Sequence, residues 1–85
     1  MKVFREYILR ALKNLGGRAR VAEVLEELER QLKGKLQPAD FKLLKDGRTV
    51  AWQNRAQWER LRMVKEGLLR SDSPHGIWEL TEKDR

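Results

Sequence analysis

The side chains best suited to chemistry in this sequence are amide and guanidinium groups between residues 48 and 60. Amides stand at Gln53, Asn54 and Gln57, and guanidinium groups stand at Arg48, Arg55 and Arg60. A side-chain amide donates and accepts hydrogen bonds together, as an adenine edge requires. A guanidinium group binds phosphate, or a guanine edge as a two-pronged donor. These residue types, with Thr49 beside Arg48, predict contacts with a nucleic acid.

Each of these side chains also has a purely structural alternative. The three amides can simply face solvent, and Asn54 can bond its local backbone. Arg55 can pair with Glu59, four residues along, if both lie on a helix. For Arg48 we favour a phosphate contact, whereas for Arg55 the two alternatives stay open.

Residues that could carry catalysis are few. The chain has no cysteine, and His75 is its one histidine. Asp40, Asp46 and Asp72 stand in predicted turns, and none belongs to the Asp…Glu-x-Lys arrangement that nucleases place on strands. No Ser-His-Asp set and no phosphate-cradling glycine loop occurs. We therefore expect no catalytic site, no metal site and no cofactor in these residues.

Positive charge is unevenly distributed along the chain, which carries a net +6. Residues 1–20 hold six basic and one acidic side chain, residues 21–41 three and five, residues 42–70 eight and three, and residues 71–85 two and four, giving +5, −2, +5 and −2. The candidate binding residues thus lie in a basic segment. That pattern favours a polyanionic partner, although modest basicity for solubility is the alternative.

Length and composition predict one small domain spanning residues 1–85. Hydrophobic residues make up 40% of the chain and include three Trp, enough for a packed helical core. Apolar runs are too short to span a membrane, and the opening MKVFREYILR is not a secretory signal. The lack of cysteine fits the reducing cytoplasm, where we expect a nucleoid-associated protein.

Apolar spacing and turn residues predict the order of the elements. Helices are expected over Val3 to Leu15 and Ala22 to Leu32, with a short edge strand at residues 18–21 between them. A short helix is expected to start at Pro38, with Phe41 and Leu44 turned inward. A long polar helix should then run from about residue 51 to residue 66 and end at Gly67.

The end of the chain predicts a β-hairpin. Leu68 and Leu69 start one strand, residues 77–80 form the other, and residues 71–76 form the tip. Ser73 and His75 stand in that tip, where His75 is either a contact for the minor groove or phosphate or an exposed turn residue. Thr81-Glu82-Lys83 looks like the start of a further helix.

A helix that leads directly into a two-stranded ribbon is the recognition-helix-plus-wing unit of winged helix-turn-helix proteins. The expected fold is therefore mainly α with a small β-ribbon: three or four helices plus a C-terminal wing hairpin. Duplex DNA would take the helix 51–66 in its major groove, with the tip 71–76 on its backbone or minor groove.

The long helix has two apolar faces when its residues are placed about 100° apart. Trp52, Ala56 and Met63 cluster on one face, and Leu61, Val64 and Leu68 cluster on the other. Periodicity alone leaves open which face is buried. Trp58 lies between the two faces, and we expect it, like Trp52 and Trp78, in the core rather than stacked on a base.

From about Ile8 to Lys83 the chain resembles the N-terminal winged-helix domain of Mrr-type restriction proteins. The matching strings are GRT at residues 47–49, WQNRAQW at 52–58, KEGLL at 65–69 and SPHGIWELTEK at 73–83. The chain departs from the family pattern at Glu59 and Glu66, where small residues are usual, at Arg62, where an aromatic is usual, and at Asp84, where a glycine usually follows.

The resemblance implies a DNA-reading module of a system that attacks modified foreign DNA, with the nuclease in a separate domain. The family pattern also places a large apolar residue at Met63. We therefore expect Met63 inward and Leu61 at least partly outward, where Leu61 can touch a pyrimidine methyl group or a second protomer. Double-stranded DNA, methylated or not, is the expected partner. A protein-interaction or dimerisation winged helix and an RNA-binding winged helix are the alternatives.

Overall fold

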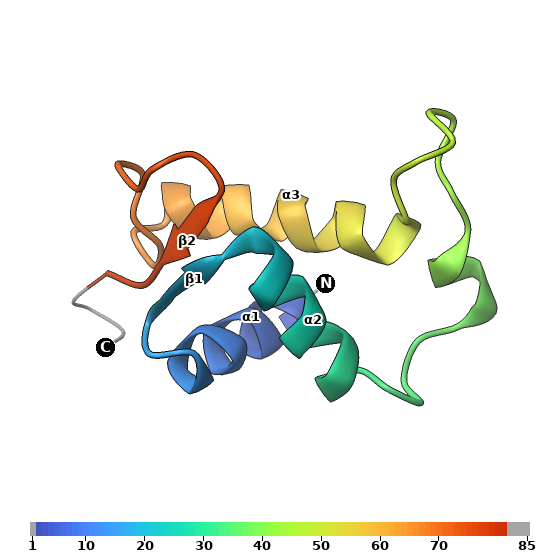
Figure 1. Cartoon of the computed structure of the whole chain (residues 1–85), viewed down its shortest axis with the longest axis horizontal. Helices are drawn as coiled ribbons and strands as arrows, with labels where there is room; N and C mark the ends of the chain where they lie inside the picture. Colours follow the sequence, from blue (N-terminus) through green and yellow to red (C-terminus); the bar gives the residue numbers. More distant parts are fainter. Residues whose placement is uncertain (1, 82–85) are drawn as a thin grey trace.

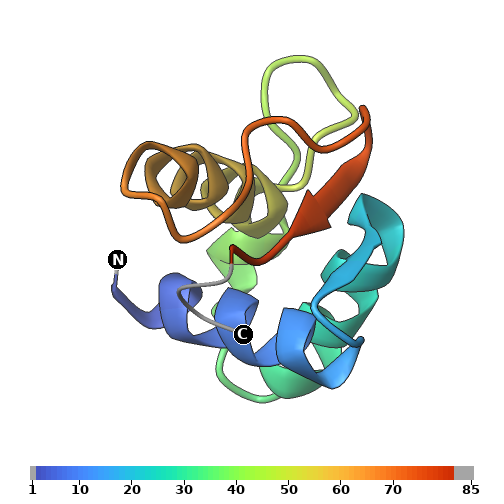
Figure 2. The same cartoon turned by 90° about the vertical axis from the view of Figure 1, so that its left-hand side faces the viewer.

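The computed structural model of the chain describes residues 2–81. The elements in order are α1 (Lys2–Asn14), β1 (Arg18–Arg20), α2 (Val21–Gln31), the 3-10 turn η1 (Pro38–Phe41), α3 (Ala51–Lys65) and β2 (Ile77–Glu79). Figures 1 and 2 show α3 lying over α1 and α2, with the two strands beside one end of α3. Three α-helices and a two-stranded antiparallel sheet are compatible with the expected winged helix. The short helix expected at Pro38 is the η1 turn. A further helix was expected to start at residues 81–83, of which residues 82 and 83 lie outside the described residues.

The core forms where the apolar stripes of the three helices meet. In α1 the buried residues recur every three or four positions, as an amphipathic helix requires. The buried apolar side chains are Phe4, Ile8, Ala11, Leu12, Ala19, Val24, Leu28, Leu32, Trp52, Ala56, Met63, Leu69, Trp78 and Leu80. The predictions that Trp52 and Trp78 belong to the core are therefore confirmed.

The strand expected near residues 18–21 is present over Arg18–Arg20 and pairs with β2. β1 and β2 run antiparallel, with Ala19 opposite Trp78. Ala19 is buried, while Arg18 and Arg20 on either side are exposed, as alternation along a strand requires. The chain enters α2 directly, because the Glu23 carboxylate accepts a hydrogen bond of 3.1 Å from the backbone N–H of Arg20.

The segment between α2 and α3 differs from the expectation in what it buries. Pro38 starts η1 as predicted, but Phe41 and Leu44 are 53% and 38% exposed, so their predicted inward orientation is wrong. Asp40 is the buried residue instead, at 6% exposure. Its carboxylate caps the turn by accepting from the backbone N–H of Gln37 at 2.7 Å. A short 3-10 turn has few inward positions, and this one is filled by a polar cap.

Residues 42–50 form a projecting loop at the start of α3, here called the 42–50 loop (Figure 1). Leu43 and Val50 pair at its base, and Asp46-Gly47 forms its turn as predicted. Gly47 has a φ of +68°, a conformation that glycine adopts without steric cost.

The C-terminal hairpin is shorter than expected. α3 ends before Gly67, whose φ of +81° is typical of a residue just past a helix end. Leu69 bridges to Leu80, and the backbone N–H of Arg70 donates to Glu79 at 2.9 Å, but residues 68–69 form no regular strand. The following residues, Ser-Asp-Ser-Pro, favour turns, and proline has no N–H for pairing. Residues 70–76 therefore form a loop, here called the 70–76 loop.

Candidate nucleic-acid interface

α3 buries the apolar face formed by Trp52, Ala56 and Met63, and of its other apolar face only Leu61 is largely exposed. Met63 is fully buried and Leu61 is 44% exposed, which confirms the expected orientation of both residues. Val64 is half-buried against the core, so it does not share the outward position of Leu61. Since α3 is a regular helix, the outward direction of Leu61 also sets the direction of Asn54 and Gln57.

Trp58 and Glu59, neighbours in the sequence, differ sharply in burial. Trp58 is 60% exposed, so its predicted place in the core is wrong, whereas Glu59 is 5% exposed. Arg5 of α1 donates to Glu59 at 2.9 Å, and Arg62 donates at 3.4 Å. A carboxylate can be buried when it is paired and hydrogen-bonded in this way. On a helical projection Glu59 lies only about 20° from Trp52, so the sequence alone could have predicted that Glu59 is on the buried face.

Of the three amides expected to contact bases, Asn54 and Gln57 lie on the outward face of α3 and Gln53 does not. Gln57 is exposed beside Leu61, and Asn54 is half-buried one turn earlier. Gln53 points toward α2 instead, where it lines a shallow cavity with Glu26 and Glu29. Because these carboxylates repel a polyanion, Asn54 and Gln57 are better placed than Gln53 to meet a nucleic acid.

Arg48 and Thr49 lie together in the 42–50 loop, at the N-terminal end of α3. Asp46 accepts hydrogen bonds of 2.9 Å from the backbone N–H groups of both residues, and one of 2.5 Å from the Thr49 hydroxyl. Those bonds, the Thr49 hydroxyl first, lower the pKa of Asp46 to about 2. The Arg48 side chain is exposed on a loop whose turn is thus fixed, while the hydroxyl proton of Thr49 is engaged by Asp46.

Arg55 forms an ion pair, though not with the residue considered from the sequence. Its guanidinium lies 2.8 Å from the carboxylate of Asp40 in η1. Glu59, the residue four positions along, is held by Arg5 and Arg62. The pair with Asp40 fixes the start of α3 to η1, and the Arg55 side chain remains about half exposed.

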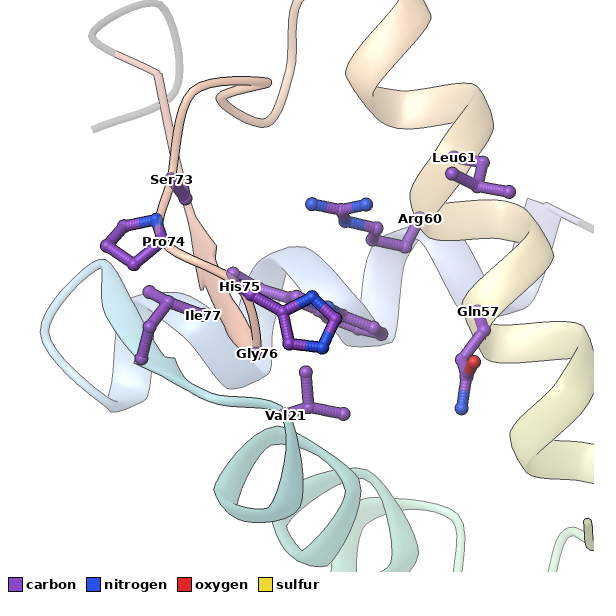
Figure 3. A pocket seen from close by; sticks show the side chains of 10 residues that line it. Val21, Gln57, Arg60, Leu61, Ser73, Pro74, His75, Gly76 and Ile77 are labelled. Carbon is purple, nitrogen blue, oxygen red and sulfur yellow. The ribbon is translucent and has the colours of Figure 1, made fainter.

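Arg60, Ser73 and His75 meet at a cavity of about 550 Å³ between α3 and the 70–76 loop, here called the α3 cavity. Its lining comprises Val21, Gln57, Arg60, Leu61, Ser73, Pro74, His75, Gly76, Ile77 and Trp78. Figure 3 shows the Arg60 side chain extending from α3 toward the loop that carries Ser73 and His75. The guanidinium carbon lies 5.9 Å from the centre of the Trp78 ring, a cation–π distance.

Seven of the ten candidate residues fall into two groups, one around the middle of α3 and the 70–76 loop and one at the N-terminal end of α3, whereas Gln53, Asn54 and Arg55 belong to neither. Five of them line one cavity: Gln57, Arg60, Leu61, Ser73 and His75. Arg48 and Thr49 lie in the loop at the other end, and Figure 1 shows the two loops separated by the length of α3. Trp58, which we expected in the core, is instead exposed on α3.

Two further findings concern residues 2–81 as a whole. Within that range no group of three or more His, Cys, Asp or Glu side chains is placed to hold a metal ion. Across the same residues, no helix combines the length and the apolar character needed to cross a membrane.

Comparison with known proteins gives one match. The family model of the Mrr N-terminal domain matches residues 2–85 of the chain. No curated protein and no solved structure matches the chain.

Proposed function

The chain belongs to the Mrr N-terminal domain family, and we propose that it binds duplex DNA as the recognition module of a restriction-type protein. In this proposal the fold is a winged helix-turn-helix and residues 1–85 form one domain. Helix α3 enters the major groove and the 70–76 loop acts as the wing. Cleavage belongs to a separate nuclease domain, and the module works in the cytoplasm on nucleoid DNA.

The observation that carries the proposal is the outward face of α3. It presents Asn54, Gln57 and Leu61 on a helix that has a loop at each end (Figure 1). An amide pairs with a base edge, each good pair giving about 1–3 kcal/mol of discrimination, and an apolar side chain suits a pyrimidine methyl group. A helix that exposes both kinds of group along one line fits a major groove.

Phosphate contacts would surround this face. Arg48 and Thr49 would meet the backbone at one end of α3, and Arg60, Ser73 and His75 at the other. Arg55 would contribute through the half-exposed part of its guanidinium while it stays paired with Asp40. Contacts of this kind set affinity and register, whereas base contacts set selectivity.

Sensitivity to modification would depend on Leu61. A methyl group at C5 of thymine or 5-methylcytosine projects into the major groove and needs an apolar contact, which Leu61 offers. The neighbouring Trp58 extends the exposed apolar area on the same helix. Gln53 remains a candidate base contact only if the duplex tilts toward α2.

Protein association is the second candidate function, because large apolar side chains are exposed. Phe41, Leu43, Leu44, Trp58 and Leu61 are between 38% and 60% exposed. Such exposure also suits a homodimer or a partner protein. Sedimentation of the domain across a concentration series tests this candidate, and a stable monomer would exclude self-association.

The test of DNA binding is fluorescence anisotropy with a labelled duplex over a range of salt concentrations. We expect the logarithm of the binding constant to fall steeply and linearly with the logarithm of salt concentration. Gln57→Ala should weaken sequence preference, while Gln37→Ala, which removes an exposed amide outside α3, should not. Equal or tighter binding to duplex RNA would favour the RNA-binding alternative, and no binding to either would reject the proposal.

A further inference from the structure

The α3 cavity contains polar atoms that are buried and unpaired. The Arg60 Nε and the Ser73 Oγ have no hydrogen-bond partner within residues 2–81, although both are shielded from solvent. Both groups line the same cavity. Since Nε–H can only donate and a hydroxyl can donate or accept, a ligand that pairs with both groups must bring at least one acceptor atom, such as a phosphate oxygen.

The charge of Arg60 is also unbalanced. Its neighbours are paired: Arg55 with Asp40, Arg62 with Glu59 and Arg70 with Asp72. Among the described residues, by contrast, no carboxylate forms an ion pair with Arg60, which stacks on Trp78 instead. A half-buried cation without a counter-charge is costly, and an anion held by charge-assisted hydrogen bonds removes that cost. The ligand that fits this end of the cavity is therefore anionic as well as a hydrogen-bond acceptor.

Part of the cavity wall is apolar. Val21, Pro74 and Ile77 contribute apolar side chains to its wall, and Pro74 stands next to Ser73 in the 70–76 loop (Figure 3). A free inorganic anion has no apolar atoms that could pack on these side chains. A sugar–phosphate unit fits the cavity, because its phosphate oxygens accept hydrogen bonds while the carbons of its deoxyribose rings pack on apolar side chains.

We propose that the α3 cavity binds one phosphodiester group of the DNA backbone. Arg60 and Ser73 donate to the phosphate oxygens, His75 donates from the rim, and the flanking deoxyribose packs on Val21 and Pro74. The inference rests on the proposed function, since the phosphodiester belongs to the bound duplex. Occupation of the cavity links the 70–76 loop to α3, so the loop is ordered by the same contact that registers the duplex.

Arg60→Met is the decisive variant. Methionine keeps an apolar side chain on the Trp78 ring but removes the charge and the Nε donor. Arg10→Met is the matched control, because Arg10 also stacks on an aromatic ring, that of Tyr7 at 5.5 Å, and lies on α1. Both variants lose one positive charge, so the loss of charge alone does not distinguish them.

Duplex binding across a salt series gives the first readout. Arg60→Met should weaken binding by about tenfold or more and reduce the log–log salt slope by about one, the amount expected for one lost phosphate contact. Arg10→Met should leave the slope unchanged. Equal slopes for the two variants would overturn the phosphate site while leaving duplex binding itself intact.

A titration of the domain with inorganic phosphate gives a readout that does not depend on duplex binding. The NMR signals of the Arg60 Nε–H and of the Ser73 and His75 backbone amides should shift saturably, while the Arg10 Nε–H stays in place. Shifts spread equally over all arginines would overturn the proposal. Saturable shifts at the cavity in a domain that binds no duplex would keep the phosphate site and reject the proposed function.

Discussion

Arg5 of α1 and Glu59 of α3 form an ion pair of 2.9 Å in which the Glu59 side chain is only 7% exposed. Arg5 also binds Glu66 near the end of α3 through two hydrogen bonds of 2.7 and 2.6 Å. One guanidinium thus joins α1 to Glu59 within α3 and to Glu66 just past its end, about two helical turns further along. The rotation of α3 about its own axis, and so the set of residues that it turns outward, depends on this contact.

Arg5→Ala should destabilise the domain by about 1–3 kcal/mol, because it leaves the buried Glu59 with only the weaker bond from Arg62. Chemical denaturation measures the change. Glu66→Ala, which breaks only the exposed half of the network, should cost about 0–1 kcal/mol. The double variant Arg5→Leu, Glu59→Leu should regain stability relative to Arg5→Ala. A double variant as unstable as Arg5→Ala would show that the unpaired Glu59 carboxylate is not the cause of the lost stability.

Arg48→Ala should weaken binding to all duplexes about equally, since a phosphate contact carries no base sequence information. Arg48 is exposed on a loop whose turn is fixed by Asp46, so its loss should not disturb the fold. Affinities for a panel of unrelated duplexes at low salt provide the measurement. An effect confined to one sequence would assign Arg48 to a base edge instead.

The double change Gln53→Ala, Asn54→Ala should lower preference among sequences more than it lowers bulk affinity. Selection from a random duplex library compares the rankings directly. Because Gln53 faces α2, the single variant Asn54→Ala should reproduce most of the effect. A ranking unchanged in the double variant would remove both amides from the interface.

Asp46 should titrate far below an ordinary aspartate, with a pKa of about 2 against an ordinary value of 3.8. A lowered pKa in the folded state means that the turn's contribution to stability is present above pH 4 and is lost as the pH falls toward 2. NMR titration of the Asp46 carboxyl carbon measures this pKa. Thr49→Val should raise it, since the Thr49 hydroxyl bond is the largest cause.

Arg48→Ala is the control for that titration, because alanine keeps the backbone N–H that bonds Asp46. The pKa of Asp46 should stay low in this variant. A rise as large as that in Thr49→Val would show that the Arg48 charge, and not the hydrogen bonds of the turn, lowers the pKa.

Local patterns predicted the elements well. The helices, the short strand at residues 18–20 and the helix end at Gly67 each follow from spacing or turn residues within a few positions. The errors arose where a distant partner decides burial. Glu59 is buried because Arg5 pairs with it from another helix, and the adjacent Trp58 is exposed. Asp40 is buried in its pair with Arg55, and the adjacent Phe41 is exposed.

In the candidate site, too, the sequence indicated the individual residues but not how they come together. Arg60, Ser73 and His75 were each identifiable by residue type and position, but their meeting at one cavity was not. The cavity joins the first residue of α2, the middle of α3 and the 70–76 loop, segments that are far apart in the sequence. No local pattern records that the Arg60 Nε and the Ser73 Oγ are buried without partners there.

Leu61 and Met63 stand two residues apart on α3 and should respond to truncation in opposite ways. Leu61→Ala should leave thermal stability almost unchanged, because the side chain is 44% exposed. It should weaken either DNA binding or self-association. If Leu61 meets a pyrimidine methyl group, the loss should be larger on a duplex carrying 5-methylcytosine or thymine at the contacted position than on one carrying cytosine.

Met63→Ala should cost roughly 2–5 kcal/mol of stability, as truncations in a packed core do. Met63 is fully buried, so the change leaves a cavity between α3 and the rest of the core. Thermal and chemical denaturation of the two variants, followed by duplex binding and sedimentation, compare them directly. Were the stability effects reversed, α3 would be turned the other way in solution, and Asn54 and Gln57 would have to leave the DNA-facing surface with Leu61.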